Sequence, residues 1–101
     1  MGTDTFRDFI LEQLATLPDL RCQRMFGGYG LYCREIFFAI LFEGRLYFKT
    51  NPATLAEYME YGAAVFAPSK KQSLRNYREV PADILEDSER LLIWARKAAH
   101  S

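Results

Sequence analysis

The chain has 101 residues, half of them hydrophobic, which predicts a single domain over residues 1–101 with one compact core. Thirteen basic and thirteen acidic residues give a formal net charge of zero, so no global charge draws the chain to nucleic acid or to an anionic membrane. Charged residues interrupt every apolar run before the roughly 18 residues of a membrane span, and the N-terminus lacks a signal-peptide pattern, so we expect a cytoplasmic protein without membrane contacts.

The first segment predicts an amphipathic helix that ends near Leu17. Thr3 or Asp4 can cap its start, and Pro18-Asp19 stops it. Apolar side chains recur at helical spacing along one side of this segment. The side expected to face the core carries Phe6, Phe9, Ile10, Leu14 and Leu17.

Between residues 22 and 49, short aromatic and aliphatic runs alternate with pairs of turn-forming residues, which predicts four antiparallel strands in a meander. Glycine supplies the positive φ that tight hairpins demand, so the third of the three turns has the clearest signal. The two-residue turns are expected at Gly27-Gly28, Arg34-Glu35 and Glu43-Gly44.

A second helix is predicted after residue 50. Asn51 suits the N-cap because its side chain accepts hydrogen bonds from the free N–H groups of the first turn, and Pro52 suits the first helical position. Gly62 is the natural C-terminal stop. The inner face of this helix is expected to carry Leu55, Tyr58 and Met59.

Two further short strands are predicted at residues 65–67 and 74–80, with a polar loop between them. From residue 81 onward acidic residues precede basic ones, which suits the dipole of a helix. Asp87 can cap a second segment, so this tail is one helix or a short helical turn followed by a longer helix. Together the elements predict an α+β fold with an antiparallel sheet and the order α-β-β-β-β-α-β-β-α.

Alternation along the strands assigns side chains to two faces of the sheet if the three turns are correct. The face expected to cover the core carries Met25, Gly30, Tyr32, Phe37, Ala39, Leu41, Leu46 and Phe48. The other face carries Tyr29, Leu31, Phe38, Ile40, Tyr47, Arg24, Arg45 and Lys49. Either helices cover this second face in part, as a second core layer, or it is an exposed patch for a partner or a second copy of the chain.

Residues that commonly carry chemistry are sparse. His100 is the only histidine and lies next to the last residue, so no Ser, Cys or Lys has a credible histidine base. The two cysteines, Cys22 and Cys33, are too few for a zinc cluster, and the first turn would place them opposite each other with their thiols reduced. We therefore expect no catalytic residue, no metal site and no cofactor.

One local basic cluster is present in the second half of the chain. It comprises Lys70, Lys71, Arg75 and Arg78. These residues can contact phosphates, and the other interpretation is a solvated loop. Because the net charge is zero, we expect any DNA affinity to stay in the non-specific range, about 10⁻⁴ to 10⁻⁶ M.

The chain resembles the N-terminal domain of the TfoX/Sxy family of competence regulators. The most specific part of this resemblance is RMFGGYGLY at residues 24–32, followed by FAI at 38–40 and GRLYFK at 44–49. The ending is similar as well, in YREVP at 77–81 and WARKA at 94–98, so the resemblance covers nearly the whole chain. The resemblance implies a two-layer α+β fold and a non-enzymatic regulator of DNA-uptake genes. Full-length members carry a second, C-terminal domain, which we do not expect in this chain.

We therefore predict a regulatory module that binds a protein partner or forms a homodimer. The candidate interaction surface comprises Arg24, Phe26, Gly27, Gly28, Tyr29, Phe38, Ile40 and Tyr47. The alternatives are direct nucleic-acid binding through the basic cluster with Arg24, Arg45 and Lys49, and small-ligand binding in a pocket between sheet and helices. The glycines of the motif also have a purely structural interpretation, since they permit a tight turn and close backbone approach.

Overall fold

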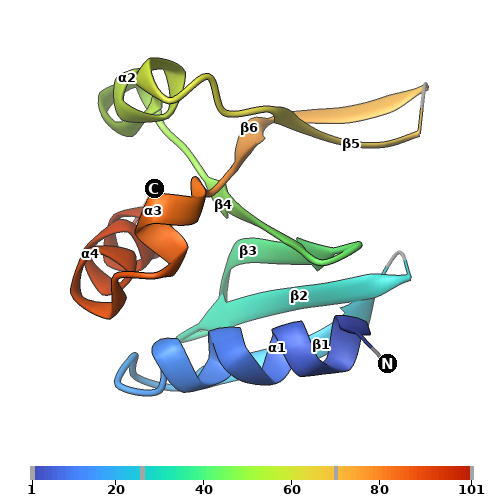
Figure 1. Ribbon diagram of the computed structural model, residues 1–101, viewed down its shortest axis with the longest axis vertical. Helices are drawn as coiled ribbons and strands as arrows, with labels where there is room; N and C mark the ends of the chain where they lie inside the picture. Colours follow the sequence, from blue (N-terminus) through green and yellow to red (C-terminus); the bar gives the residue numbers. More distant parts are fainter. Residues whose placement is uncertain (1, 26, 70, 101) are drawn as a thin grey trace.

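The computed structural model of the chain describes residues 2–25, 27–69 and 71–100. The helices and strands in chain order are α1 (Gly2–Gln13), β1 (Leu20–Met25), β2 (Gly28–Cys33), β3 (Ile36–Phe42), β4 (Arg45–Lys49), α2 (Pro52–Glu60), β5 (Val65–Ser69), β6 (Gln72–Glu79), α3 (Ala82–Leu85) and α4 (Ser88–Ala99). The strands form one antiparallel sheet in the order β1-β2-β3-β4-β6-β5 (Figure 1). The predicted α+β class and element order are confirmed, with the tail built as the short α3 followed by α4.

One main core forms where the helices meet a single face of the sheet. In Figure 1, α1 runs alongside β1 and β2, and α4 packs against β3 and β4. Ile10 of α1 and Leu91 of α4 are completely buried there, together with Phe38 of β3 and Phe48 of β4. Burial of one such side chain contributes about 1.5 to 3 kcal/mol. This core layer holds the helices against the sheet.

The first helix is shorter than predicted. Regular helix ends at Gln13, because the chain then tightens into turns in which Ala15 N donates to Glu12 O and Leu17 N donates to Leu14 O. Leu14 and Leu17 are still buried, as predicted for the core-facing side. The predicted core position of Phe9 is wrong, since its side chain is 42% exposed.

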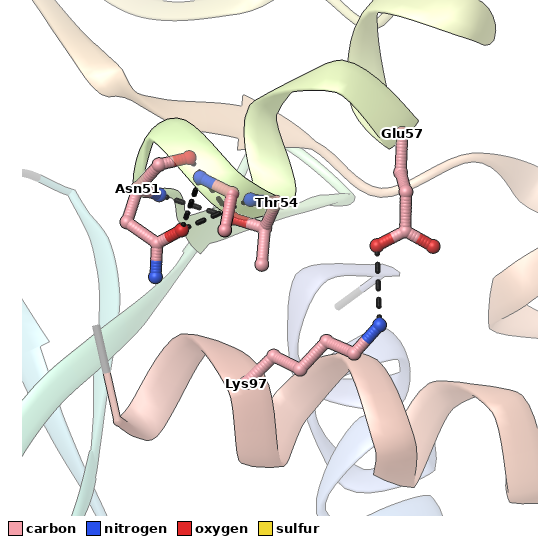
Figure 2. Close-up of polar contacts among 5 residues, drawn as sticks. Asn51, Thr54, Glu57 and Lys97 are labelled. Carbon is pink, nitrogen blue, oxygen red and sulfur yellow. Dashed lines mark hydrogen bonds and ion pairs between the residues drawn. The ribbon is translucent and has the colours of Figure 1, made fainter.

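Helix α2 begins and ends as the sequence predicts. Asn51 Oδ1 accepts hydrogen bonds from Ala53 N at 2.8 Å and Thr54 N at 2.9 Å, and Asn51 N donates back to Thr54 Oγ1 at 3.0 Å (Figure 2). This reciprocal pair is a capping box. Thr54 and Tyr58, one turn apart, form the buried stripe, so Met59 lies off that stripe and is 57% exposed, contrary to its predicted inner position.

The second and third predicted turns are confirmed. Cys33 pairs with Ile36 across Arg34-Glu35, and Phe42 pairs with Arg45 across Glu43-Gly44. All four turn residues have positive φ, between 51° and 72°, which matches the right-handed twist of the flanking strands.

The first predicted turn is wrong by one residue. Met25 pairs with Gly28, so the two-residue connection comprises residues 26 and 27, and residue 26 lies outside the described residues. Cys33 consequently pairs with Leu20 rather than with Cys22. Gly28 belongs to the strand for a steric reason, since a Cβ atom there would overlap the carbonyl oxygen of Leu41 in β3.

A β-bulge changes the predicted faces of the sheet. Tyr32 pairs with Phe37 but Leu31 pairs with Ala39, so Phe38 is an extra residue that turns its side chain into the main core. Ala39, Leu41, Leu46 and Phe48 face the helices, as predicted. The predicted assignment is wrong for two further sets, because Tyr29, Leu31 and Phe38 face the helices while Met25, Gly30, Tyr32 and Phe37 lie on the second face.

Candidate functional site

The second face of the sheet holds a smaller aromatic core of its own. Ile40, Tyr47, Phe66 and Tyr77 are buried there, and no helical residue among those described belongs to this cluster. Tyr77 of β6 donates a hydrogen bond to the carbonyl oxygen of Phe37 in β3 at 3.4 Å, although β4 lies between these strands. The sheet therefore curves until its own strands cover this face, and helices are not needed to do so.

Three predicted surface residues are consequently buried. Phe38 has no exposed area in the main core, while Ile40 is 1% and Tyr47 is 8% exposed in the second cluster. The ring of Tyr47 lies 4.9 Å from that of Phe66, centroid to centroid. In this conformation of the chain these side chains are packing residues and offer no free apolar patch.

The glycines of the signature motif, residues 24–32, have steric roles. Gly27 has a φ of 79° in the first turn, and Gly28 lies against the backbone of β3. Gly30 lies beneath the Met25 sulfur and the Phe37 ring, which leave no space for a Cβ atom. Phe26 lies outside the described residues, so its predicted role stays a prediction.

Arg24 and Tyr29 are the motif residues that reach a polar groove. An open groove of about 470 Å³ lies between α1 and the first two strands, and we call it the signature groove. Arg7 of α1 donates a hydrogen bond through Nη1 to the Tyr29 hydroxyl at 3.1 Å, and its guanidinium carbon lies 4.9 Å from the centre of the Tyr29 ring. The groove is lined by Arg7, Asp8, Leu11, Cys22, Arg24 and Tyr29.

The signature groove carries an excess of positive charge. Arg7 is paired with Asp8 Oδ1 at 3.2 Å, so this carboxylate offsets one of the two guanidinium groups. Arg24 is exposed and makes no hydrogen bond or ion pair with any residue that the structure describes. One guanidinium group is therefore available to an incoming anion.

The Cys22 thiol in this groove is not activated. Burial raises its pKa above the usual 9.0, and the positive charge of Arg7 opposes this effect only in part. The thiol is therefore protonated near neutral pH and is a poor nucleophile. What the groove offers a ligand is charge and hydrogen bonds.

The structure describes three of the four residues of the predicted basic cluster, and one of these three is hydrogen-bonded to the backbone. Lys71 and Arg75 are exposed on the hairpin of β5 and β6, whereas Lys70 lies outside the described residues. Arg78 donates through Nη1 to the carbonyl oxygen of Ala63 at 3.1 Å, and its Nε is buried without a hydrogen-bond partner among the described residues. The side chain of Arg78 therefore binds the backbone of the connection that follows α2.

Two other basic residues named for nucleic-acid binding lie apart from that hairpin tip. Arg45 is ion-paired with Glu79 at 3.1 Å, so its charge is offset. Lys49 lies beside Thr54 of α2 and Trp94 of α4.

Across residues 2–25, 27–69 and 71–100, no group of three His, Cys, Asp or Glu side chains is placed to hold a metal ion. In the same part of the chain, every helix is too short or too polar to cross a membrane.

Sequence reasoning missed Arg7. Its position on a polar side of α1 resembles that of any solvated basic residue, and nothing in the pattern connects it with a strand that begins more than ten residues later.

Most of the chain matches a known protein family. A family model described as the TfoX N-terminal domain matches residues 12–101, which include the signature motif and every described strand. A comparison with curated proteins finds no match. The chain therefore belongs to the TfoX N-terminal domain family.

Proposed function

We propose that this chain is a non-enzymatic regulatory module that binds a protein partner through the signature groove. The TfoX N-terminal domain family supports a competence-related regulatory role at the level of the family. The observation that carries the proposal is the meeting of Arg24 and Tyr29, from the signature motif, with Arg7 of α1 around one open groove. A cytoplasmic location stays a prediction.

The partner is expected to present an acidic segment. Arg24 is exposed and free of described partners, and guanidinium groups form paired hydrogen bonds with carboxylates. Tyr29 is held by Arg7 and is only 6% exposed, so the partly buried Leu11 supplies the apolar surface of the groove. An extended acidic stretch with an apolar residue would satisfy both features.

Nucleic acid is the weaker candidate for the same groove. The Asp8 carboxylate, 3.2 Å from the Arg7 guanidinium, leaves the groove with one excess positive charge, which is too few to neutralise a run of backbone phosphates. Lys71 and Arg75 lie on a different hairpin and Arg78 is turned toward Ala63, which argues against one continuous phosphate-binding surface. We therefore favour a protein partner.

The test compares Arg24→Gln with Arg75→Gln, a matched loss of one exposed arginine outside the groove. Fluorescence anisotropy would measure the affinity for a labelled peptide rich in Asp and Glu and for a DNA duplex of random sequence. We expect Arg24→Gln to weaken peptide binding by about fivefold, which corresponds to about 1 kcal/mol, and Arg75→Gln to leave it unchanged.

Proteins retained from native lysate should follow the same order, with loss on Arg24→Gln and retention on Arg75→Gln. Tight, salt-sensitive DNA binding that Arg75→Gln reduces would overturn the proposal in favour of a nucleic-acid-binding domain. Equal effects of the two variants on the peptide would show that only overall charge matters.

A further inference from the structure

A second hollow, of about 160 Å³, lies where the end of α4 meets the turn between β2 and β3. The α1–β1 connection closes its remaining side. It shares no lining residue with the signature groove. Its principal lining residues are Leu17, Cys33, Arg34, Ile36, Arg96 and Ala99.

The interior of this hollow is apolar. Leu17, Cys33 and Ala99 are buried with at most 6% exposure. The Cys33 thiol lies 3.2 Å from the carbonyl oxygen of Pro18 and donates its hydrogen bond there. Ile36, the first residue of β3, is 41% exposed at the rim of the hollow. Among these apolar lining residues, Ile36 is therefore the one with most uncovered surface.

Two arginines provide positive charge at the same hollow. The guanidinium groups of Arg34 and Arg96 are exposed, and neither forms an ion pair or hydrogen bond with a described residue. Among the described lining residues none is acidic. Elsewhere Arg45 and Lys97 each pair with a glutamate at 3.1 and 3.2 Å. The hollow thus combines an apolar interior with cations that have no counter-charge among the described residues.

The backbone at Arg34 is held in an uncommon conformation. Arg34 has a φ of 51° and Glu35 a φ of 67°, although neither is a glycine. Turns of this kind usually carry Asn-Gly or Asp-Gly, because those residues adopt positive φ with little strain. Asparagine or glycine would form this turn with less strain, so the turn itself does not require an arginine.

We propose that this hollow binds a small carboxylate with an apolar body. The carboxylate would accept hydrogen bonds from Arg34 and Arg96, and the apolar body would lie against Leu17, Ile36 and Ala99. A cavity of about 150 Å³ accommodates a benzene ring, so an aryl or branched alkyl group has the right size. A free organic acid and the last residue of a peptide chain share this chemistry. The proposal does not depend on the signature groove.

Titration of the whole, isotope-labelled chain with phenylacetate tests the proposal by two-dimensional NMR. We expect a Kd of about 0.1 to 1 mM, with shifts centred on the amides of Cys33, Ile36 and Ala99. Phenylacetamide keeps the ring without the charge, and acetate keeps the charge without the ring. Each should bind at least about tenfold more weakly than phenylacetate.

A second pair of probes distinguishes the two sources of the carboxylate. A short peptide that ends in phenylalanine is compared with its amidated form. Tighter binding of the free-acid peptide than of phenylacetate would identify a chain end as the ligand, and tighter binding of phenylacetate would identify a free organic acid.

The double variant Arg34→Gln/Arg96→Gln changes two exposed side chains and should weaken phenylacetate binding by about tenfold or more while the spectrum stays that of a folded chain. Arg75→Gln is the matched control and should bind as the parent does. Three outcomes would overturn the proposal: equal binding of phenylacetamide, no effect of the double variant, or no shifts at these amides with about 10 mM phenylacetate.

Discussion

Gly28 lies where the backbones of β2 and β3 come too close for any side chain. A Cβ atom there would overlap the Leu41 carbonyl oxygen and lie 3.1 Å from the carbonyl carbon. Main-chain atoms cannot move aside as the end of a flexible side chain can. We therefore expect Gly28→Ala to lower the free energy of unfolding by about 1 to 3 kcal/mol. Thermal unfolding followed by circular dichroism should show a Tm lower by about 4 to 8 °C for each kcal/mol.

Gly27→Ala is the natural comparison, since nothing lies within 4 Å of a Cβ atom at Gly27 and only its φ of 79° opposes a side chain. Gly27→Ala should lower the free energy of unfolding by about 1 kcal/mol. If Gly28→Ala were no more harmful than Gly27→Ala, the close approach of the two strands would be wrong.

Phe38 tests whether the buried aromatic residues are core or interface. Its ring centroid lies 5.9 Å from that of Phe48, and the side chain has no exposed area. We expect Phe38→Ala to cost about 3 to 5 kcal/mol, and its combination with Tyr47→Ala to unfold the chain. Urea unfolding measures the loss. If the double variant were as stable as the parent but no longer bound a partner, Phe38 and Tyr47 would be interface residues and not core residues.

At the scale of single elements, α2 depends on its N-cap. Asn51→Ala removes the acceptor of two backbone N–H groups, those of Ala53 and Thr54. We expect a loss of about 0.5 to 2 kcal/mol, measured by urea unfolding with an unchanged m-value. Glu57→Gln is the control within the same helix. It breaks the ion pair with Lys97, whose two side chains are both more than 40% exposed, and should cost less than about 1 kcal/mol (Figure 2).

Elements that carry a local signal could be predicted from the sequence. Asn51 with Pro52 marks a helix start through its own side-chain chemistry, and Gly44 marks a turn through its positive φ. The first turn failed because two adjacent glycines fit two registers, and only the contact of Gly28 with β3 decides between them. The bulge at Phe38 has no sequence signal, because an extra strand residue resembles any other.

The candidate site was predictable only in part. Arg24 and Tyr29 could be singled out because they belong to a recognisable motif. The groove that they share could not be predicted, because it depends on how α1 lies against β1 and β2. That placement decides whether Arg7 faces the two strands. Burial of Ile40 and Tyr47 likewise depends on sheet curvature, which no short segment encodes.

At the scale of the whole molecule, the curved sheet predicts sensitivity to alkaline pH. Burial, with a smaller effect of nearby Tyr32, raises the pKa of Tyr77 from 10.0 to about 12. The folded chain therefore holds this proton more tightly than the unfolded chain does. The stabilisation is complete below pH 10 and is lost as the pH rises toward about 12.

Tyr77→Phe removes this titration. Over the same pH range we expect its free energy of unfolding, measured in urea, to fall less steeply than that of the parent. Tyr61→Phe, at a 43% exposed position outside the aromatic cluster of the second face, is the comparison and should follow the parent. Parallel curves for the parent and Tyr77→Phe would place Tyr77 in contact with water.

The strand order also bears on the sequence of events during folding. The first four strands pair with their chain neighbours through short turns, so little loop entropy is lost when they assemble. Pairing of Tyr47 with Glu79 must instead close a loop that contains all of α2 and β5. We expect the meander to belong to the folding nucleus and the β5–β6 hairpin to dock late, so that the aromatic second face stays open to water until the last kinetic step.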